Sequence, residues 1–247
     1  SDVKNINKTQ DLTNTTDTPR LGTIENYRLS ATCEKTNEEC PGHLGMINLP
    51  EDIIHPFFRL IAMKVLQCVC ITCGKLLLSE KYIIESGLIQ IQGFTRLNKI
   101  AELTKDGKRN CSNGCPTNPI FKPQKSGDNE TLNMFCIRKI GKQEIQHFLS
   151  VATIKNIFNS LSDKTVSLLG FINNHPKNFI VDFVPVLPIS ARPHVFRVVD
   201  NQKQEDYLST GYDDIMSKNI EYYQIKREDS NTTSEEERKE ECLKKII

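Results

Sequence analysis

The chain has 247 residues, of which 38% are hydrophobic, with nine cysteines, no tryptophan and a formal net charge of +1. This length allows one large or two small domains, and the low hydrophobic fraction favours a loop-rich fold or a piece whose apolar faces are completed by other chains. The near-neutral charge argues against a chain that coats nucleic acid by itself. Because no apolar run is long enough for a membrane span and the N-terminus does not resemble a signal peptide, we expect neither a membrane-spanning nor a secretory segment.

The first half of the chain alternates polar segments with short apolar ones. Residues 1–19 are polar and end at Pro19, which predicts an extended or poorly ordered lead-in. Residues 46–49 favour a short strand, and residues 88–91 a weaker one. Between them, helical spacing from Pro56 up to the Cys70 turn is shown by Phe57, Phe58, Ile61, Val65, Leu66 and Val69.

The second half begins with a polar loop over residues 116–131, followed by a strand over residues 132–137. Apolar spacing predicts one amphipathic helix near residues 154–161 and a second that ends near Gly170. The run from Phe179 begins as a strand and ends as a proline-stiffened loop. Residues 205–225 are expected to be helical, and a capping box at Ser234 begins an exposed helix that runs to the end of the sequence, as if cut there.

The most informative residues are pairs of metal ligands on short turns. Cys40 and His43 are separated by two residues, as are Cys70 and Cys73, so each pair can reach one tetrahedral ion from a tight turn. Cys111 and Cys115 form a third close pair, in which Gly114 relaxes the turn. Zinc is the ion expected for such ligands. A secreted disulfide framework fits these gaps less well, and a redox Cys-x-x-Cys would need to begin a helix rather than follow one.

The ligands divide into two sets. Cys70, Cys73, Cys111 and Cys115 have the layout of a structural zinc site, in which two close pairs are separated by a long loop. The second set has three visible ligands, Cys33, Cys40 and His43, and its fourth must come from elsewhere or be water. A catalytic zinc is disfavoured because no general base lies near this set in sequence. Cys68, Cys136 and Cys242 have no partner at ligand spacing and are expected to be small core residues.

Several blocks of sequence resemble the N-terminal clamp region of the largest subunit of multisubunit DNA-dependent RNA polymerases of eukaryotes, archaea and large DNA viruses. They are residues 18–24 (TPRLGTI), 39–45 (ECPGHLG), 68–77 (CVCITCGKLL), 154–158 (IKNIF), 167–171 (SLLGF) and 184–188 (VPVLP), followed by Arg192-Pro193. The blocks follow the family's order from about residue 18 to about residue 225. The resemblance implies an α+β, loop-rich clamp module stabilised by zinc, with a helical hairpin at its C-terminal end, as a fragment of a larger subunit.

The resemblance also implies a division of the chain. Residues 1–19 are the lead-in, 20–191 the clamp core and head with both zinc-ligand sets, 192–206 a lid-like loop, and 207–247 the start of a coiled-coil arm. It implies two zinc sites, but the family's first ligand stands where this chain has Ser30. A serine hydroxyl stays protonated at neutral pH and binds zinc poorly, so this site is expected to be weaker or to use a substitute.

The implied function is mechanical. A clamp holds template DNA and the RNA–DNA hybrid, and its lid helps to separate RNA from template. In the lid-like segment, Arg192, Arg197 and Lys203 are the expected phosphate contacts and Phe196 a wedge, although each is equally well an ordinary loop residue. The tip of the arm would dock initiation and elongation factors, and its alternative is a solvated helical hairpin. Other polymerase subunits, above all the second-largest, are the expected partners.

The catalytic centre is expected to lie outside this sequence. The family holds magnesium with three aspartates in a motif that this sequence lacks, so nucleotidyl transfer and Mg²⁺ belong to the complete enzyme. The expected location is intracellular, either in the nucleus or, for a viral protein, in the virus factory and virion. The alternative functions are a free-standing zinc-binding adaptor or transcription factor and, less favoured, a redox enzyme that uses Cys70 and Cys73.

Overall fold

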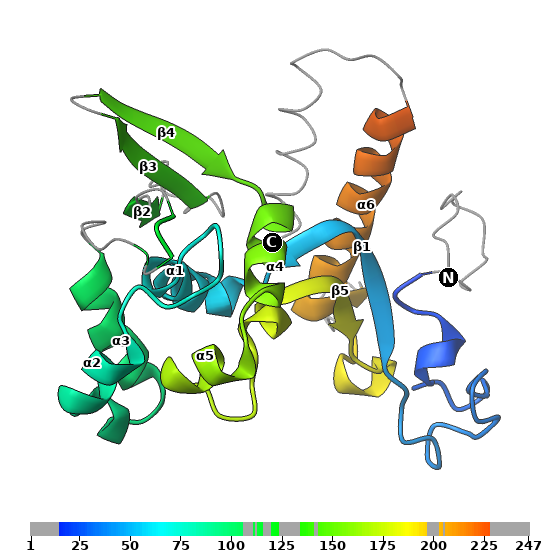
Figure 1. Cartoon of the computed structure of the whole chain (residues 1–247). Helices are drawn as coiled ribbons and strands as arrows, with labels where there is room; N and C mark the ends of the chain where they lie inside the picture. The colour runs from blue at the N-terminus through cyan, green and yellow to red at the C-terminus, as the bar shows by residue number, and fades with distance from the viewer. Residues whose placement is uncertain are drawn as a thin grey trace. The chain divides into compact units, whose positions relative to one another are not determined.

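The computed structural model describes residues 15–105, 111, 113–115, 120–123, 134–140, 143–196, 203–204 and 206–227 (Figure 1). Helices and small antiparallel sheets are both present, as expected for an α+β fold. The chain forms two compact units. The first unit consists of residues 1–51 and 182–247, and the second unit of residues 52–181. Within the described residues, no helix is long and apolar enough to cross a membrane.

The second unit is mainly helical. Its helices are α1 (Arg59–Cys68), α2 (Glu80–Glu85), α3 (Gly93–Thr104), α4 (Val151–Asn159) and α5 (Asp163–Leu168), with short 3-10 turns at Pro56–Phe58, Leu88–Gln90 and Pro176–Phe179. Strands β2 (Ile120–Pro123), β3 (Met134–Ile140) and β4 (Gln143–Leu149) form an antiparallel sheet in the order β2-β3-β4. Helices α2, α4 and α5 each begin with a serine whose hydroxyl accepts a backbone hydrogen bond, at Ser79, Ser150 and Ser162.

The core of the second unit joins helices that are far apart in the sequence. Val65 and Leu66 of α1, Ile100 of α3 and Phe158 of α4 are fully buried in one cluster. Phe179 belongs to the same cluster and stacks on Phe58, with ring centroids 4.8 Å apart. Burial of these apolar side chains fixes α1, and therefore fixes the turn that follows it at Cys70.

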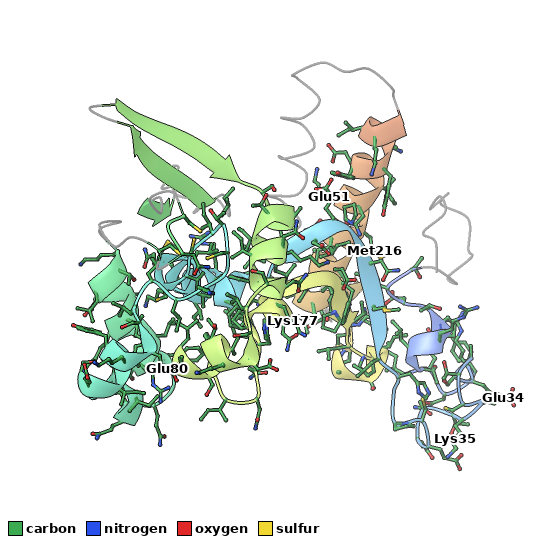
Figure 2. All side chains as sticks on the ribbon, viewed as in Figure 1. Glu34, Lys35, Glu51, Glu80, Lys177 and Met216 are labelled. Carbon is green, nitrogen blue, oxygen red and sulfur yellow. The ribbon has the colours of Figure 1, made fainter. Side chains whose placement is uncertain are left out.

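The first unit is built around the long helix α6 (Tyr207–Arg227). Strands β1 (Gly45–Ile54) and β5 (Ile180–Val186) pair with each other, and each contains a boundary between the units. A small core is formed by Leu21, Ile47 and Val186 together with Tyr212 and Met216 of α6. Figure 2 shows Met216 on α6 and Glu51 on β1. The remaining elements are the 3-10 turns Pro19–Leu21 and Ile189–Ala191 and the hairpin of β6 (Val195–Phe196) and β7 (Lys203–Gln204).

Most of the predicted elements are confirmed. The helix before Cys70, the strand near residues 132–137, both central helices and the helix near residues 205–225 are all present. Residues 88–91 are not a strand, because Leu88–Gln90 forms a 3-10 turn after Gly87, whose positive φ of 73° reverses the chain. The predicted loop over residues 116–131 contains β2, and β4 was not predicted. The predicted helix after Ser234 lies outside the described residues.

The predicted divisions do not coincide with the two units. The segment 20–191 contains the whole second unit and part of the first. Of the predicted lead-in, residues 15–19 are described, and Thr16 and Thr18 are buried within the first unit. Thr16 donates a hydrogen bond of 2.8 Å to Asp213 of α6. Part of the segment 192–206 is a hairpin, in which Val195 pairs with Gln204 and Phe196 with Lys203.

Candidate metal centres

The structure brings the four predicted thiols of the second unit together. The sulfur atoms of Cys70, Cys73, Cys111 and Cys115 all lie within 4.8 Å of one another. Cys73 Sγ is 3.4 Å from Cys111 Sγ, far beyond the roughly 2.05 Å of a disulfide bond. Two sulfurs bound to one tetrahedral zinc at about 2.3 Å would lie about 3.8 Å apart, so the spacing fits a shared ion and not a covalent pair.

A tight turn at Cys70 presents the first two thiols. Gly74 N–H donates to Cys70 O and Cys70 N–H donates to Lys75 O, both at 2.8 Å, which folds residues 70–75 into a closed turn. Gly74 has a φ of +68°, in the left-handed region that favours glycine. Lys75 then reaches the second pair of ligands, because its Nζ donates to Asn113 Oδ1 at 3.1 Å. Sequence reasoning missed this link between the two ligand turns.

The thiols of this set have shifted pKa values. The Asn113 backbone N–H lowers the pKa of Cys111 to about 7, despite the opposing effect of burial. Burial has the largest effect on Cys115, and together with hydrogen bonds to the neighbouring thiols it raises the pKa of this residue to about 12. Four thiolates cannot all be charged at such short distances without a compensating cation. This donor set therefore fits a divalent soft metal, and zinc is the ion that prefers four thiolates.

The first unit contains the three-ligand set, here called the Cys33 site. Cys33, Cys40 and His43 place their ligand atoms within 4.8 Å of one another. Cys40 Sγ is 3.6 Å from Cys33 Sγ and 3.6 Å from His43 Nε2. A tetrahedral zinc with ordinary bond lengths would place a sulfur and a nitrogen ligand about 3.6 Å apart, so these three atoms also fit one ion.

A close backbone approach fixes the Cys40–His43 turn. Gly42 has a φ of +78°, and a Cβ at this position would lie 2.6 Å from Pro188 Cβ and 2.8 Å from Ser190 Oγ. His43 N–H also donates to Leu21 O at 3.1 Å, which ties the turn to the 3-10 turn at Pro19–Leu21. The absence of a side chain at Gly42 therefore lets the segment near Pro188 support the ligand turn.

Ser30 lies beside the Cys33 site. The serine is buried. A hydrogen bond from Ser30, which has the largest effect, and one from His43 lower the pKa of the Cys33 thiol to about 6. Glu34, which follows Cys33 directly, has a φ of +58°, a backbone conformation that costs most side chains about 1 kcal/mol or more. Glu34 and Lys35 lie in this loop of the first unit (Figure 2).

The remaining described cysteine of the first half, Cys68, belongs to the core. It is fully buried at the end of α1, and burial raises the pKa of its thiol to about 12. The prediction that it is a core residue is confirmed. The side chain of Cys136, on β3, and the whole of Cys242 lie outside the described parts of the chain.

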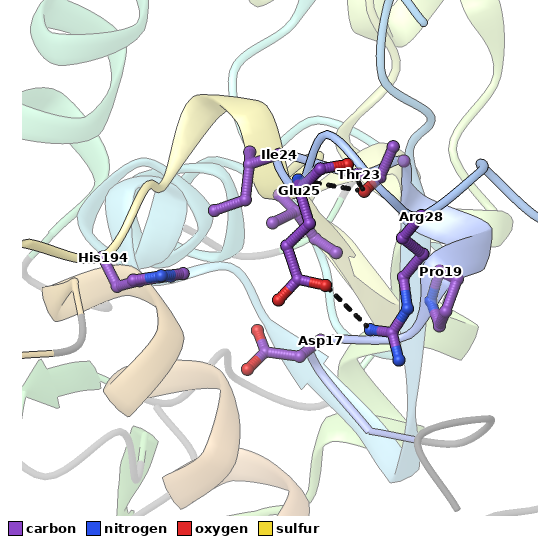
Figure 3. Close-up of a pocket in the computed structure, with 9 residues that line it drawn as sticks. Asp17, Pro19, Thr23, Ile24, Glu25, Arg28 and His194 are labelled. Atoms are coloured by element: carbon purple, nitrogen blue, oxygen red, sulfur yellow. Dashed lines mark hydrogen bonds and ion pairs between the residues drawn. The ribbon is translucent and has the colours of Figure 1, made fainter. Parts of the chain in front are cut away.

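A small pocket of about 150 Å³ lies near the start of the first unit (Figure 3). Asp17, Glu25, Arg28 and His194 line it, and the Glu25 carboxylate pairs with Arg28 at 3.7 Å. Across the described ranges, only the two cysteine-containing sets bring three or more potential ligand atoms together.

Arg192, one of the predicted phosphate contacts, has a different environment from the one expected. Its side chain is fully buried, and its Nε donates to Leu187 O at 3.1 Å. Its two terminal nitrogens donate to Ser209 Oγ, at 2.7 Å, and to the Thr16 carbonyl. Asp17 lies 3.5 Å away, and the Tyr212 ring packs against the guanidinium. Protein groups thus already contact the Arg192 guanidinium, which connects residues 16–17, the segment after β5 and α6, and its contact with phosphate stays a prediction.

The other predicted contacts are described only in part. Phe196 and Lys203 are paired residues of the β6–β7 hairpin, and no side-chain placement is described for either. Arg197 lies outside the described residues. Their roles remain predictions.

Substitution of Gly74 is expected to be costly, whereas substitution of Gly114 is not. Both have positive φ values, but a Cβ on Gly74 would lie 2.5 Å from Ser160 Oγ and 3.1 Å from Ser160 O, while nothing lies within 4 Å of one on Gly114. We expect Gly114→Ala to cost about 1 kcal/mol of unfolding free energy, from backbone strain alone, and Gly74→Ala to cost about 2 kcal/mol or more. Urea denaturation with zinc present measures both values. Equal costs would contradict the described packing of the Cys70 turn.

Comparison with known proteins places these sites in a wider context. The family model for RNA polymerase Rpb1, domain 1, matches residues 3–243. The DNA-directed RNA polymerase II subunit RPB1 of Euplotoides octocarinatus is 29% identical over 218 residues, which cover 81% of this chain and 44% of that protein. The DNA-directed RNA polymerase subunit 1 of Acanthamoeba polyphaga mimivirus is 28% identical over 222 residues, 81% of this chain and 14% of that protein.

A third relative comes from another virus. A probable DNA-directed RNA polymerase II subunit RPB1 homolog of Invertebrate iridescent virus 6 is 27% identical over 225 residues, 86% of this chain and 21% of that protein. The chain thus spans less than half the length of each of these relatives.

Proposed function

The chain belongs to the RNA polymerase Rpb1, domain 1, family, and we propose that it acts as the clamp part of a DNA-directed RNA polymerase largest subunit. In this role it helps to hold template DNA and the RNA–DNA hybrid during transcription. The observation that carries the proposal is the family match over residues 3–243, joined to the two metal-ligand sets inside the matched region. The activity to which it contributes is nucleotidyl transfer by the complete enzyme, which also supplies the catalytic Mg²⁺.

In the proposed clamp, zinc has a structural role. Cys70, Cys73, Cys111 and Cys115 would hold one ion, and Cys33, Cys40 and His43 a second. Zinc would supply charge neutralisation and rigid crosslinks between turns. The four-thiol set joins the turn after α1 to the residues after α3, and the Cys33 site joins two loops that precede β1. Such crosslinks let thin, loop-rich elements move as rigid bodies, which is what a clamp that presses on nucleic acid requires.

The β6–β7 hairpin is the proposed lid. We assign Arg197 and Lys203 to phosphate contacts and Phe196 to a wedge between separating strands. Arg192 has a supporting role in this proposal, because its buried guanidinium fixes the segment that leads into β6.

The proposed partners are the other polymerase subunits, especially the second-largest. Initiation and elongation factors would bind beyond α6, at the tip of the arm, and the protein would work in the nucleus or, if viral, in the virus factory and virion.

The lid assignment is tested in the assembled polymerase that contains this subunit. Replacing both Arg197 and Lys203 with alanine is expected to make transcribing complexes dissociate at lower salt, because the lost phosphate contacts lower the affinity for nucleic acid. Each lost contact should also make the plot of log affinity against log salt less steep, by about 0.7 to 0.9. The measurement is the lifetime of stalled complexes over a salt series. The matched control is Lys164→Ala, because Lys164 is exposed and pairs with Glu80 at 2.6 Å in the second unit.

The same experiment separates the proposal from its alternative. If the control and the double variant weaken the complexes equally, the lid assignment fails while the polymerase role stands. A free-standing zinc adaptor, the alternative function, would not co-purify with the second-largest subunit. Failure of the tagged full-length protein to co-purify with that subunit would therefore overturn the clamp role itself.

A further inference from the structure

The turn that precedes the Cys33 site has the same backbone pattern as the Cys70 turn. Ser30 N–H donates to Lys35 O at 2.9 Å, and Glu34 N–H donates to Ser30 O at 2.8 Å. The equivalent bonds in the second unit join Cys70 to Lys75 and Gly74 to Cys70, both at 2.8 Å. In each turn the fifth residue has a positive φ, 58° at Glu34 and 68° at Gly74.

The ligand positions of the two turns correspond as well. Cys33 stands fourth in its turn, as Cys73 does in the other. In each turn the sulfur accepts a hydrogen bond from the backbone N–H two residues later, Lys35 for Cys33 and Lys75 for Cys73. Ser30 therefore occupies the place of Cys70, the first metal ligand. The two turns also share the sequence Thr-Cys-x-Lys, at residues 32–35 and 72–75, so the residues and the backbone hydrogen bonds both support their equivalence.

The Ser30 hydroxyl is already engaged by protein groups. Its oxygen accepts a hydrogen bond from Thr32 N–H at 3.3 Å, and it is hydrogen-bonded to the Cys33 sulfur. Ser30 is 1% exposed, so its side chain has no freedom to turn toward solvent. An alcohol oxygen also lies nearer its own Cα than a thiol sulfur does and remains neutral at physiological pH. The Ser30 hydroxyl, which is neutral and held close to its own backbone, is therefore a poor fourth ligand for a site made of thiolates.

We propose that the Cys33 site binds its ion through only three protein atoms, from Cys33, Cys40 and His43, and leaves the fourth position to a small exchangeable donor, such as a thiol, from solution. The four-thiol set of the second unit, in contrast, is closed to external ligands. The three ligand residues of the Cys33 site are all partly exposed, which gives a small donor access. This inference rests on the proposed binding of metal at the Cys33 site.

The test uses cobalt(II) as a coloured substitute for zinc in the full chain. We expect the wild-type protein to bind two equivalents, and its sulfur-to-cobalt absorption to rise and then saturate as 2-mercaptoethanol is added. In Ser30→Cys the absorption should already be higher and should not respond to the thiol. We also expect a chelator to remove zinc from the Cys33 site at least about tenfold faster in the wild type than in Ser30→Cys, the smallest effect usual for altering a ligand's surroundings.

Each outcome decides a different point. The variant Cys33→Ala should bind one equivalent and lose the thiol response, which assigns that response to this site and not to the four-thiol set. Two equivalents in the wild type with no thiol response would overturn the open position and leave the structural zinc role intact. A single equivalent in the wild type would overturn metal binding at the Cys33 site and the inference with it. A thiol response that persists in Ser30→Cys would also contradict the inference.

Discussion

Cys111→Ser is expected to remove one zinc equivalent and to destabilise the second unit strongly. Cys111 lies 3.4 Å from Cys73, in a set whose four sulfurs lie within 4.8 Å of one another. Structural zinc contributes on the order of 10 kcal/mol in small zinc domains. Losing even a quarter of that stabilisation would lower the midpoint of thermal unfolding by about 10 °C in a domain of the size of the second unit. Metal analysis and thermal denaturation measure both effects.

The control for this prediction is a cysteine that is buried but is not a ligand. Cys68 is fully buried and its thiol pKa is raised to about 12, so it stays a neutral core residue at physiological pH. Cys68→Ala should cost about 1 kcal/mol for the lost sulfur and retain the wild-type zinc content. A similar loss of stability in both variants, or unchanged zinc in Cys111→Ser, would show that the four thiols do not hold a structural ion.

The zinc of this set should also be released by acid. The Cys111 pKa is lowered to about 7, and a bound divalent ion lowers thiol pKa values further, so the thiolates stay unprotonated at neutral pH. For groups whose pKa is lower in the folded, metal-bound state, the stabilisation is present at higher pH and is lost as the pH falls through that lowered pKa. We therefore expect the stability of the second unit to decline more steeply with acidification when zinc is present than when a chelator has removed it, as measured by thermal denaturation in both conditions.

Arg192→Ala is expected to cost the first unit about 3 kcal/mol of unfolding free energy. The substitution removes a fully buried guanidinium and leaves Ser209 Oγ and the carbonyls of Leu187 and Thr16 without their donor. Breaking a buried charged network by removing one partner typically costs about 3–5 kcal/mol, and the partial exposure of Asp17 places this case at the lower end. Arg192→Lys should recover less than half of the loss, because an ammonium group cannot reproduce the planar fork.

The matched control is another arginine of the same unit. Arg28 pairs with Glu25 at 3.7 Å with its side chain 41% exposed, so Arg28→Ala should cost less than about 1 kcal/mol. Urea denaturation followed by circular dichroism compares the variants. If Arg192→Ala keeps full stability and instead weakens nucleic-acid binding by the polymerase, the original phosphate-contact prediction is correct and the structural role is wrong.

The metal-ligand sets were predictable because their spacing is local. Each pair lies on a single turn, so the sequence distance alone restricts how far apart its two ligands can be in space. The pairs are Cys70 with Cys73 and Cys40 with His43. The pairing of Cys70–Cys73 with Cys111–Cys115 was also predictable from the count of ligands that a zinc ion needs. The wrong assignment of residues 88–91 has a related physical origin, since a short apolar run does not distinguish a strand from a 3-10 turn.

By itself, the sequence determined the ligand pairs, the helix that delivers Cys70, the long helix α6 and the resemblance to the polymerase family. These features depend on short-range spacing, on helical periodicity and on ordered blocks of residues, all of which are present in a one-dimensional string. Only the tertiary structure decided that Arg192 is buried, because its partners Thr16, Leu187 and Ser209 come from three separate segments. It also showed that the turn at Ser30 has the backbone hydrogen bonds and the positive φ, at Glu34, of the turn at Cys70, a geometry that supports the ligand position that the family resemblance implies for Ser30.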